Sequence, residues 1–404
     1  MLVWQRANHF IGAKNVSRKD FLKRNIERAQ KFSAKAKSVF EIMPLTFILP
    51  KEYVAFLELF SDLEEKEGRM NYWIMKPAAQ SRGRGISLVN DISQVHYGEP
   101  MVMQRYLKTP LLLNGYKFDL RIYVLVTSVN PIEIFIYKEG FGRFSTQPYT
   151  LDPTDKGNKY IHLTNVSINK YNLKNYDCNN QDRIYGGTKV SLATLKKTFV
   201  EDLKIDWDNI IWAQIKQVCL KAMVAAQNDI AFNPNCFDLY GFDVIFDEDL
   251  KAWLLEINAS PALSCETLLD DMIKQRLIDD TIDLIDPVDY DRKRLFEVLE
   301  RRAQEEFGGA KTTGNQHQKR SMNKDLTYIL HGKVPRAYGE MPKNLGNYER
   351  LAPSEWSESY LKLIGGQKMF GSQMKVSEKM TPAQREKVRG PGSMPVVSDK
   401  QGGN

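Results

Sequence analysis

The carboxylates and the amide of one predicted hairpin could bind a metal ion. Residues 240–246 and 252–258 alternate between two faces, and the intervening DEDLK is typical of a turn. Regular pairing across this turn places Asp243 opposite Glu256, with Asn258 on the same face. Two adjacent carboxylates destabilise each other unless a cation or a proton lies between them. Oxygen donors without Cys or His suit Mg²⁺, whereas the alternative is a polar cluster solvated on an open sheet face.

The opposite face of the second strand of this hairpin is apolar. Trp253, Leu255 and Ile257 alternate with the polar residues, because successive side chains of a strand point to opposite faces. We expect these three side chains to anchor the polar face to the core of the protein.

A glycine-rich basic loop could bind phosphate groups. Residues 73–89 are predicted to form a strand, a loop and a second strand. Gly83 would let backbone N–H groups approach phosphate oxygens, while Lys76 and Arg82 supply positive charge. The loop is not a Walker A motif, because it lacks G-K-[ST] and does not open a helix. A tight hairpin turn without a ligand is the alternative.

Charged residues also mark the start of a predicted buried strand at 117–126. Lys117, Asp119 and Arg121 share one face, and Phe118 lies on the other. The residues that follow are apolar on both faces, which indicates a buried strand. Charges at the end of such a strand are expected to point into a functional site, although an exposed sheet edge would also tolerate them.

Short polar and cationic groups occur in three further segments. HLTN contains Thr164 and Asn165, which alone would indicate a turn or a helix cap. GFGRF and YGGTK place Arg143 and Lys189 after glycines, where each could bind a carboxylate. Together with the metal and phosphate groups they describe an ATP site without the kinase motifs H-R-D and D-F-G. This combination predicts an α/β protein with an ATP-grasp-type ligase fold.

The wording and order of the motifs resemble the tubulin–tyrosine-ligase-like family, in particular its polyglutamylase branch. The motifs are WIMKP, RGRGI, QRYL, KFDLR, HLTN, YGFD and LLEINASP, and the resemblance covers about residues 8–285. It implies an enzyme that uses Mg²⁺ and ATP to convert a carboxylate into an acyl phosphate, which an amine then attacks. Such a route needs no nucleophilic side chain, in keeping with a sequence in which no Ser–His or Cys–His arrangement is recognisable.

In the polyglutamylase branch the activated carboxylate belongs to glutamate in a tubulin C-terminal tail, and the amine is that of free L-glutamate. Elongating members have Gln where this chain has Arg82 and His where it has Ala259, so the resemblance favours chain initiation. A glycine or tyrosine ligase of the same family, or a non-catalytic microtubule-binding relative, stays open as an alternative.

The resemblance also assigns roles to individual residues. Arg121 is implied to lie near the transferring phosphoryl group, with Lys117 and Asp119 beside it. Arg143 and Lys189 are implied to bind the carboxylates of free glutamate. The implied metal ligands are Asp243, Glu256 and Asn258, and the implied nucleotide-binding residues are Lys76, Arg82, Gly83, Gln104, Arg105, Tyr106, Leu107, Lys117, Phe118, Asp119, Thr164 and Asn165.

Charge is distributed unevenly along the 404 residues. Residues 1–38 and 308–404 each carry a net charge of +8, and the segment between them carries −9. Basic ends favour an anionic partner, and the resemblance identifies it as the microtubule. A nucleic acid is the alternative partner, but the sequence shows no aromatic or Arg-rich elements of the kind that recognise nucleic acids. We expect a monomeric protein of the cytoplasm and cytoskeleton, including the cilium or basal body.

Cysteine usage and hydropathy agree with this compartment. Four scattered cysteines form no C-x-x-C pair, which favours reduced thiols over a disulfide framework. No window approaches the roughly 18 consecutive apolar residues of a membrane span, and the first residues do not resemble a secretory signal.

Hydrophobic periodicity predicts the elements that position these groups. We expect strands at 42–50, 72–76, 86–90, 100–106, 117–126, 132–138 and the hairpin 240–258, and helices at 17–30, 51–67, 191–203, 208–226 and 266–282. The expected parts are a truncated N-terminal or linker part at 1–70, an ATP-grasp core at 71–285, a helical extension at 286–307 and a mostly disordered basic tail at 308–404.

Overall fold

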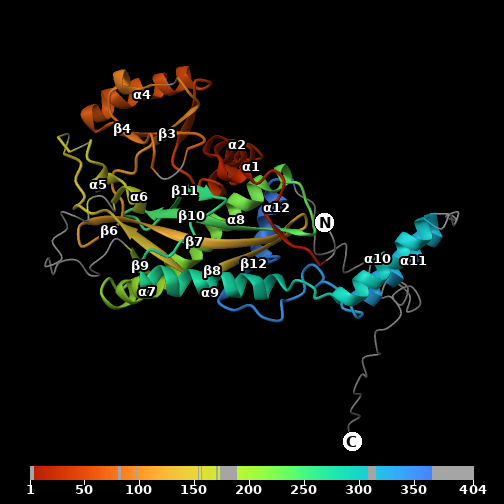
Figure 1. Cartoon of the computed structure of the whole chain (residues 1–404). Helices are drawn as coiled ribbons and strands as arrows, with labels where there is room; N and C mark the ends of the chain where they lie inside the picture. Colours follow the sequence, from red (N-terminus) through yellow and green to blue (C-terminus); the bar gives the residue numbers. More distant parts are fainter. Residues whose placement is uncertain are drawn as a thin grey trace, which may run out of the picture.

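The largest element of the computed structural model is a twisted sheet in which the described residues form eight strands (Figure 1). The structure describes residues 4–80, 83–96, 98–152, 154–155, 157–169, 172, 189–307 and 315–365. The sheet runs in the order β1-β10-β7-β8-β12, with β11, β6 and β9 paired to β10, β7 and β8. The strands span Ala7–Asn8 (β1), Leu112–Leu113 (β6), Tyr116–Val129 (β7), Ile132–Phe144 (β8), Lys189–Ser191 (β9), Cys236–Phe246 (β10), Ala252–Asn258 (β11) and Tyr348–Ala352 (β12).

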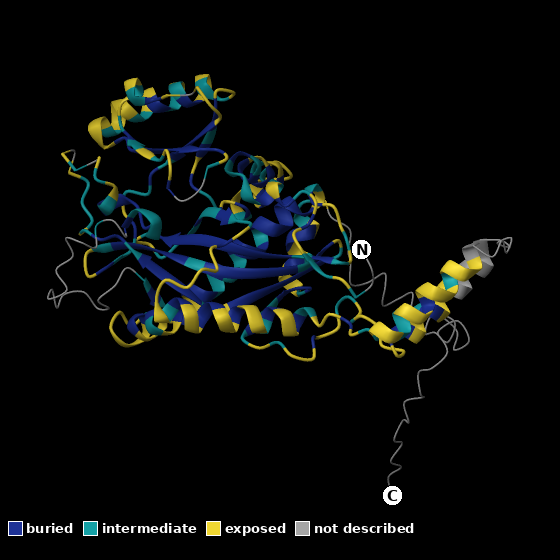
Figure 2. Ribbon diagram, viewed as in Figure 1, coloured by how far each residue is buried: buried dark blue, intermediate teal, exposed yellow. Residues whose placement is uncertain are grey.

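Helices cover both faces of this sheet. Ile122 of β7 faces α8 (Ala213–Ala226) and α2 (Lys19–Gln30), whereas Tyr123 faces α9 (Leu268–Ile285). The middle of β7 is therefore buried on both sides, as its apolar run predicts (Figure 2). The remaining helical segments on this part are α1 (Lys14–Ser17), α3 (Ala34–Val39), α5 (Lys159–His162), α6 (Val166–Asn169), α7 (Leu192–Glu201), a π-helical turn at Trp207–Trp212 and a 3₁₀ turn at Gln227–Asp229.

A second, smaller sheet lies beside the first and has the strand order β2-β5-β3-β4. Phe56 and Phe60 of its covering helix pack around Trp73 and close a separate small core. This small sheet faces one end of the large sheet (Figure 1), and side chains of both sheets line the space between them. Its elements are β2 (Thr46–Leu49), α4 (Tyr53–Glu67), a 3₁₀ turn at Gly68–Met70, β3 (Trp73–Pro77), β4 (Ser87–Val89), a 3₁₀ turn at Ile92–Gln94 and β5 (Met101–Arg105).

The elements predicted from periodicity are confirmed up to residue 307. The part boundary expected at residue 70 stays a prediction, and residues 1–70 are distributed over both sheets. β1 is a strand of the large sheet, and α2 packs on α8 of the same unit. The predicted strand and helix between residues 42 and 67 belong instead to the small sheet. Residues 1–70 therefore contribute to both sheets, because chain order does not reveal which core an apolar face joins.

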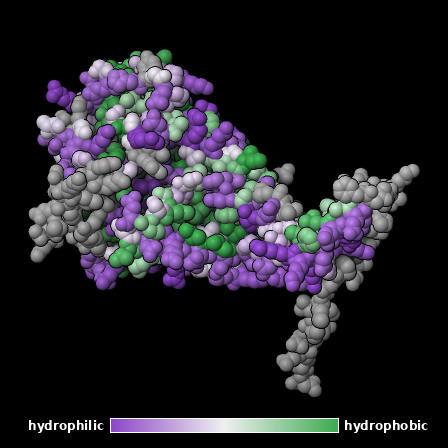
Figure 3. Space-filling view, viewed as in Figure 1, coloured by the Kyte–Doolittle hydropathy of each residue, from purple (hydrophilic) through white to green (hydrophobic). Residues whose placement is uncertain are grey.

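Within the segment expected to be a mostly disordered tail from residue 308, the described residues 315–365 contain helices and a strand. α10 (Arg292–Phe307) and α11 (Asn315–Ile329) form a projecting helical hairpin, on whose described part Figure 3 shows hydrophilic surface beside a hydrophobic patch. β12 then pairs antiparallel with β8, and α12 (Glu355–Leu363) packs on α8. The low apolar content of this segment gave no sign of a strand in the sequence. β12 forms nevertheless, because the existing edge of β8 supplies its pairing partner. Residues 366–404 lie outside the described part of the chain.

Two further expectations concern the whole chain. No helix among the described residues is long and apolar enough to cross a membrane. Cys219, Cys236 and Cys265 are free thiols, and Cys178 lies outside the described residues.

Candidate active site

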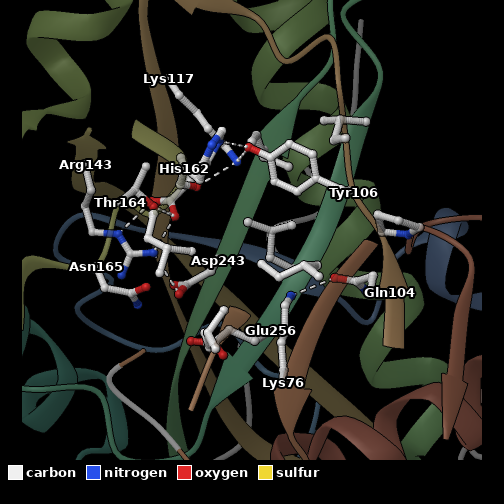
Figure 4. A pocket seen from close by; sticks show the side chains of 18 of the residues that line it. Lys76, Gln104, Tyr106, Lys117, Arg143, His162, Thr164, Asn165, Asp243 and Glu256 are labelled. Atoms are coloured by element: carbon white, nitrogen blue, oxygen red, sulfur yellow. Dashed lines mark hydrogen bonds and ion pairs between the residues drawn. The ribbon is translucent and has the colours of Figure 1, made fainter. Parts of the chain in front are cut away.

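A cavity, here called the first cavity, lies between the two sheets (Figure 4). The small sheet contributes β3 and β5, the large sheet contributes β7, β10 and β11, and the loop before α6 closes one side. Apolar walls come from Ile74, Ile86 and Leu163. Most sequence-predicted site residues line this cavity: Lys76, Gln104, Arg105, Tyr106, Leu107, Lys117, Asp119, Arg143, Thr164, Asn165, Asp243 and Glu256.

The hairpin of β10 and β11 places its two carboxylates in the first cavity. Asp243 pairs in register with Glu256, as predicted, and Asn258 follows on β11 opposite Gly241. The register holds because of a β-bulge: Val244 already pairs with Leu254, so one residue of β11 is inserted between the two pairs.

The bulge changes which side chains of β11 reach the core. Leu254 and Ile257 are buried in the main core, whereas Leu255 lines the first cavity. The indole N–H of Trp253 donates to Asp247 at the edge of the sheet. The expectation that Trp253, Leu255 and Ile257 share one core-facing side is therefore correct only for Ile257, since an inserted residue reverses the alternation.

Two arginines and two aspartates form a buried charge network at the floor of the first cavity. Arg143 donates to both Asp119 oxygens at 2.6 and 2.7 Å and lies 2.8 Å from an Asp243 oxygen. Arg121 donates to the two Asp243 oxygens at 2.6 and 3.2 Å. Burial would raise the pKa of Asp243, but the two arginines hold that pKa well below its ordinary value. Asp243 is therefore ionised at neutral pH.

Two buried lysines face this charge network from opposite sides (Figure 4). Lys76 donates to Gln104 at 2.7 Å, and burial lowers its pKa to about 8. Lys117 donates to the Tyr106 hydroxyl and to the His162 carbonyl, both at 2.9 Å, and burial lowers its pKa to about 7. Both ammonium groups lack full hydration, so an anionic ligand in the cavity would bind them strongly.

Three further predicted nucleotide-binding residues have side chains with other partners or lie outside the described residues. Phe118 is buried in the main core, where it stacks on Phe144, because it points away from Lys117 and Asp119. Arg105 lines the first cavity, but its guanidinium pairs with Glu67 and stacks on Trp73. Arg82 lies outside the described residues.

The glycine predicted for close approach does occupy a crowded turn. Gly83 has a φ of +72°, and a Cβ atom there would lie 2.4 Å from Ile168 and 3.2 Å from the Asn165 side chain. The turn after β3 therefore packs against the segment that carries Thr164 and Asn165. Only glycine fits this position without displacement.

A larger cleft, here called the second cleft, adjoins the first cavity. Arg143, Asn165 and Glu256 line both spaces, so the two adjoin at these side chains. The second cleft also receives the remaining predicted site residues: Arg121, Lys189 and Asn258.

Lys189 is held in the second cleft by a buried carboxylate that sequence reasoning did not identify. Lys189 lies 2.7 Å from Asp270, and Lys274 lies 2.7 Å from the same carboxylate. Asp270 follows the N-cap Thr267 of α9 and is fully buried. Burial would raise the pKa of Asp270, but the lysines lower it to about 2. The pair of lysines leaves a net positive charge on this wall.

Other residues of the site escaped sequence reasoning because their partners are distant in the chain. The ammonium of Lys19 on α2 lies 3.1 Å from Glu256. Gly241 lets Arg121 cross β10, since a Cβ atom there would lie 3.1 Å from Cδ of Arg121 and 2.9 Å from Pro261. A strand glycine between alternating apolar residues is the one local signal that could have indicated such a close approach.

The donor set of the hairpin fits Mg²⁺. Asp243, Glu256 and Asn258 offer oxygen ligands only, and Mg²⁺ is usually held by one or two carboxylates together with substrate phosphates. No group of three or more His, Cys, Asp or Glu in the described part of the chain could hold a metal. The proposed set consists of two carboxylates and an amide, and it would need phosphate oxygens to complete it.

Comparisons with known proteins point to one group of relatives. A sequence model described as "Tubulin-tyrosine ligase family" matches residues 1–294. The probable tubulin polyglutamylase TTLL2 of Homo sapiens is 37% identical over 283 residues, which cover 70% of this chain and 46% of that protein. The tubulin polyglutamylase TTLL5 of Homo sapiens is 37% identical over 289 residues, which cover 70% of this chain and 22% of that protein. The tubulin polyglutamylase ttll6 of Danio rerio is 33% identical over 372 residues, which cover 89% of this chain and 45% of that protein. The match thus spans less than half of each of these relatives.

Proposed function

The chain belongs to the tubulin-tyrosine ligase family, and we propose that it is an ATP-dependent ligase that adds glutamate to glutamate side chains of tubulin C-terminal tails. Its fold is of the ATP-grasp type expected for that family. The observation that carries the proposal is the first cavity, in which two buried lysines face paired carboxylates between two sheets. The names of the relatives, tubulin polyglutamylases, support glutamate and tubulin as substrates.

In this proposal the first cavity binds ATP. Lys76 and Lys117 compensate the phosphate charges, Tyr106 and Leu107 line the wall beside the base, and Thr164 contributes a hydroxyl. Asp243, Glu256 and Asn258 would hold Mg²⁺, which supplies positive charge to the phosphate oxygens. Cations placed where negative charge gathers lower the barrier to acyl-phosphate formation. Arg121, between the cavity floor and the second cleft, is assigned to the transferring phosphoryl group.

The second cleft is proposed to bind the two carboxylate-bearing substrates. Arg143 and Lys189 would hold the carboxylates of free glutamate, while the γ-carboxyl of the protein substrate enters where the cleft meets the first cavity. The amine then attacks the acyl phosphate, phosphate leaves, and an amide bond forms. Chain initiation rests on the family resemblance at Arg82 and Ala259.

The proposed setting of this activity is the cytoskeleton. We infer that the protein acts as a monomer on microtubules in the cytoplasm, including those of the cilium or basal body. The positive net charge of residues 1–38 supports an attraction to acidic tubulin tails, which salt would weaken.

The decisive experiment is an amino-acid competition with the purified full chain. With Mg²⁺ and ATP, the protein is expected to incorporate labelled glutamate into tubulin. Labelled glycine incorporated in place of glutamate would contradict the polyglutamylase assignment but leave the ligase assignment intact.

Substitution of Glu256 tests the metal site in the same assay. Glu256→Gln should lower ligation by about 10²–10³-fold, because it removes one carboxylate from the proposed ligands. Glu248→Gln, at an exposed position on the turn of the same hairpin, is the matched control and should retain activity. Circular dichroism would verify that both variants are folded. Normal activity of the Glu256 variant would refute the metal assignment.

A further inference from the structure

Three residues far apart in the chain form a hydrogen-bonded row beside the second cleft. His9 follows β1, Asp238 lies on β10, and Ser260 follows β11. Nδ1 of His9 lies 2.7 Å from Oδ1 of Asp238, and Nε2 of His9 lies 3.3 Å from Oγ of Ser260. The parallel pairing of β1 with β10 brings the first two together, and the turn after β11 adds the third.

The hydrogen bonds around Asp238 fix the tautomer of His9. Asp238 is fully buried and also accepts from the Phe10 N–H at 3.0 Å and from the Tyr240 hydroxyl at 2.9 Å. Burial raises the pKa of Asp238, and the three donors offset this rise only in part; in its ionised form the carboxylate can only accept. Nδ1 of His9 therefore carries the proton, and Nε2 presents a lone pair to the Ser260 hydroxyl.

The backbone of His9 is in a conformation that L-residues rarely adopt. Its φ is +115°, outside the regions that a side chain favours. Its N–H donates to the Phe237 carbonyl at 2.7 Å, and its ring donates to Asp238, so the surrounding structure holds the strained residue in place. Strain of this kind is characteristic of residues at functional sites.

The row ends at a wall of the cleft in which the amine is proposed to lie. Ser260 lines the second cleft together with Arg143 and Lys189, the proposed ligands of the glutamate carboxylates. The ammonium group of an α-amino acid is one carbon away from its α-carboxylate, so it lies in the same cleft. An ammonium cannot attack an acyl phosphate until it loses a proton, because its nitrogen has no free electron pair.

We propose that Ser260, His9 and Asp238 form a proton relay that deprotonates the incoming amino acid, an inference that rests on the proposed ligase function. The ammonium gives one proton to Oγ of Ser260 as the Ser260 proton moves to Nε2 of His9. Asp238 stabilises the resulting imidazolium. The freed electron pair of the amine nitrogen forms the bond to the acyl carbon, and the bond between that carbon and the phosphate oxygen breaks. The second proton of the nitrogen leaves with the phosphate.

Exposure of the ring allows the relay to reset. The His9 side chain is 46% exposed, so the imidazolium can release its proton to water after each turnover. Ser260 contacts the ammonium in this proposal, whereas His9 and Asp238 act through it. Sequence reasoning found no Ser–His arrangement, since His9 and Ser260 are separated by 251 positions.

The test compares two nucleophiles on the purified full chain with tubulin, Mg²⁺ and ATP. Glutamate enters as an ammonium and needs the relay, whereas hydroxylamine is largely uncharged at neutral pH and traps acyl phosphates as hydroxamates without it. His9→Gln and Ser260→Ala should lower glutamate ligation by about 10²–10⁴-fold, the usual contribution of general base catalysis. Hydroxamate formation should stay within about twofold of the unsubstituted protein.

Controls separate the relay from a structural role of the same residues. His96→Gln, at an exposed position, should leave both reactions unchanged. Ser260 is exposed, so its variant remains informative if the His9 variant misfolds. An equal loss of ligation and hydroxamate formation in the Ser260 variant would overturn the relay, and so would retention of full ligation. An unsubstituted protein that forms neither product would refute the ligase function itself.

Discussion

Lys76 and Lys117 illustrate at the residue scale how burial prepares a group for one kind of ligand. Each donates to neutral partners, Gln104 or Tyr106, and neither forms a close ion pair in the described structure. Burial therefore lowers their pKa values to about 8 and about 7. A polyanion would restore the charged form, because each ammonium would gain a partner that compensates its lost hydration.

This charge state predicts a pH dependence of nucleotide affinity. In the free protein the pKa values of Lys76 and Lys117 are about 8 and about 7, and a bound phosphate group would raise both. The affinity for ATP is therefore complete below about pH 7 and falls as the pH rises through 7 to 8 and beyond. Calorimetric titration with an ATP analogue should also detect proton uptake on binding near pH 8. Lys117→Met should bind more weakly with a shallower pH dependence. Affinity that rises between pH 7 and 9 would contradict the assignment.

At the scale of elements, β12 and α12 complete the unit that carries the site. β12 covers the outer edge of β8, and Arg336 pairs with the buried Glu133 at the start of that strand at 2.6 Å. Leu351 and Leu361 enter the main core. The far end of β8 carries Arg143. The C-terminal segment thus stabilises a strand that positions the charge network.

Substitution within β12 tests this role. Leu351→Ala should lower the free energy of unfolding by about 2–5 kcal/mol, because Leu351 is 4% exposed and its truncation leaves a cavity. Val334→Ala, at a site that is 82% exposed in the same segment, should change it by less than about 0.5 kcal/mol. Urea denaturation of both variants provides the measurement. Equal changes in the free energy of unfolding for the two variants would show that β12 does not contribute to the core.

For the whole molecule, the placement of the first cavity between two separate cores has a mechanical consequence. Lys76 and Gln104 belong to the small sheet, whereas Lys117 and Asp243 belong to the large one. A ligand that contacts all four joins two units with separate hydrophobic cores. Binding should therefore stabilise the molecule as a whole.

Thermal unfolding tests this coupling. An ATP analogue with Mg²⁺ at 100 times its dissociation constant should add about 2.7 kcal/mol of stability and raise Tm. Lys76→Met should abolish most of the increase at the same ligand concentration, whereas Lys37→Met, at an exposed position on α3, should retain it. An unchanged Tm of the unsubstituted protein at saturation, with binding verified by calorimetry, would contradict a ligand held between the sheets.

Local patterns of the sequence determined the elements and much of the site. The alternation at Asp243, Glu256 and Asn258 predicted the hairpin and one polar face on it, whereas the pairing of the two carboxylates, although predicted correctly, depends on the bulge. The charged face of Lys117 and Asp119 predicted that they would enter a cavity. These features depend on residues that are close in the chain or paired across a single turn.

Tertiary structure alone decided the features that depend on long-range packing. The bulge that moved Leu255 into the cavity, the pairing of β12 with β8 and the division of residues 1–70 between two sheets have no local signature. The same holds for the contacts of Lys19 with Glu256 and of His9 with Ser260. Period and propensity specify which face of an element is apolar, but the partner that covers this face is chosen by the free energy of packing the whole chain.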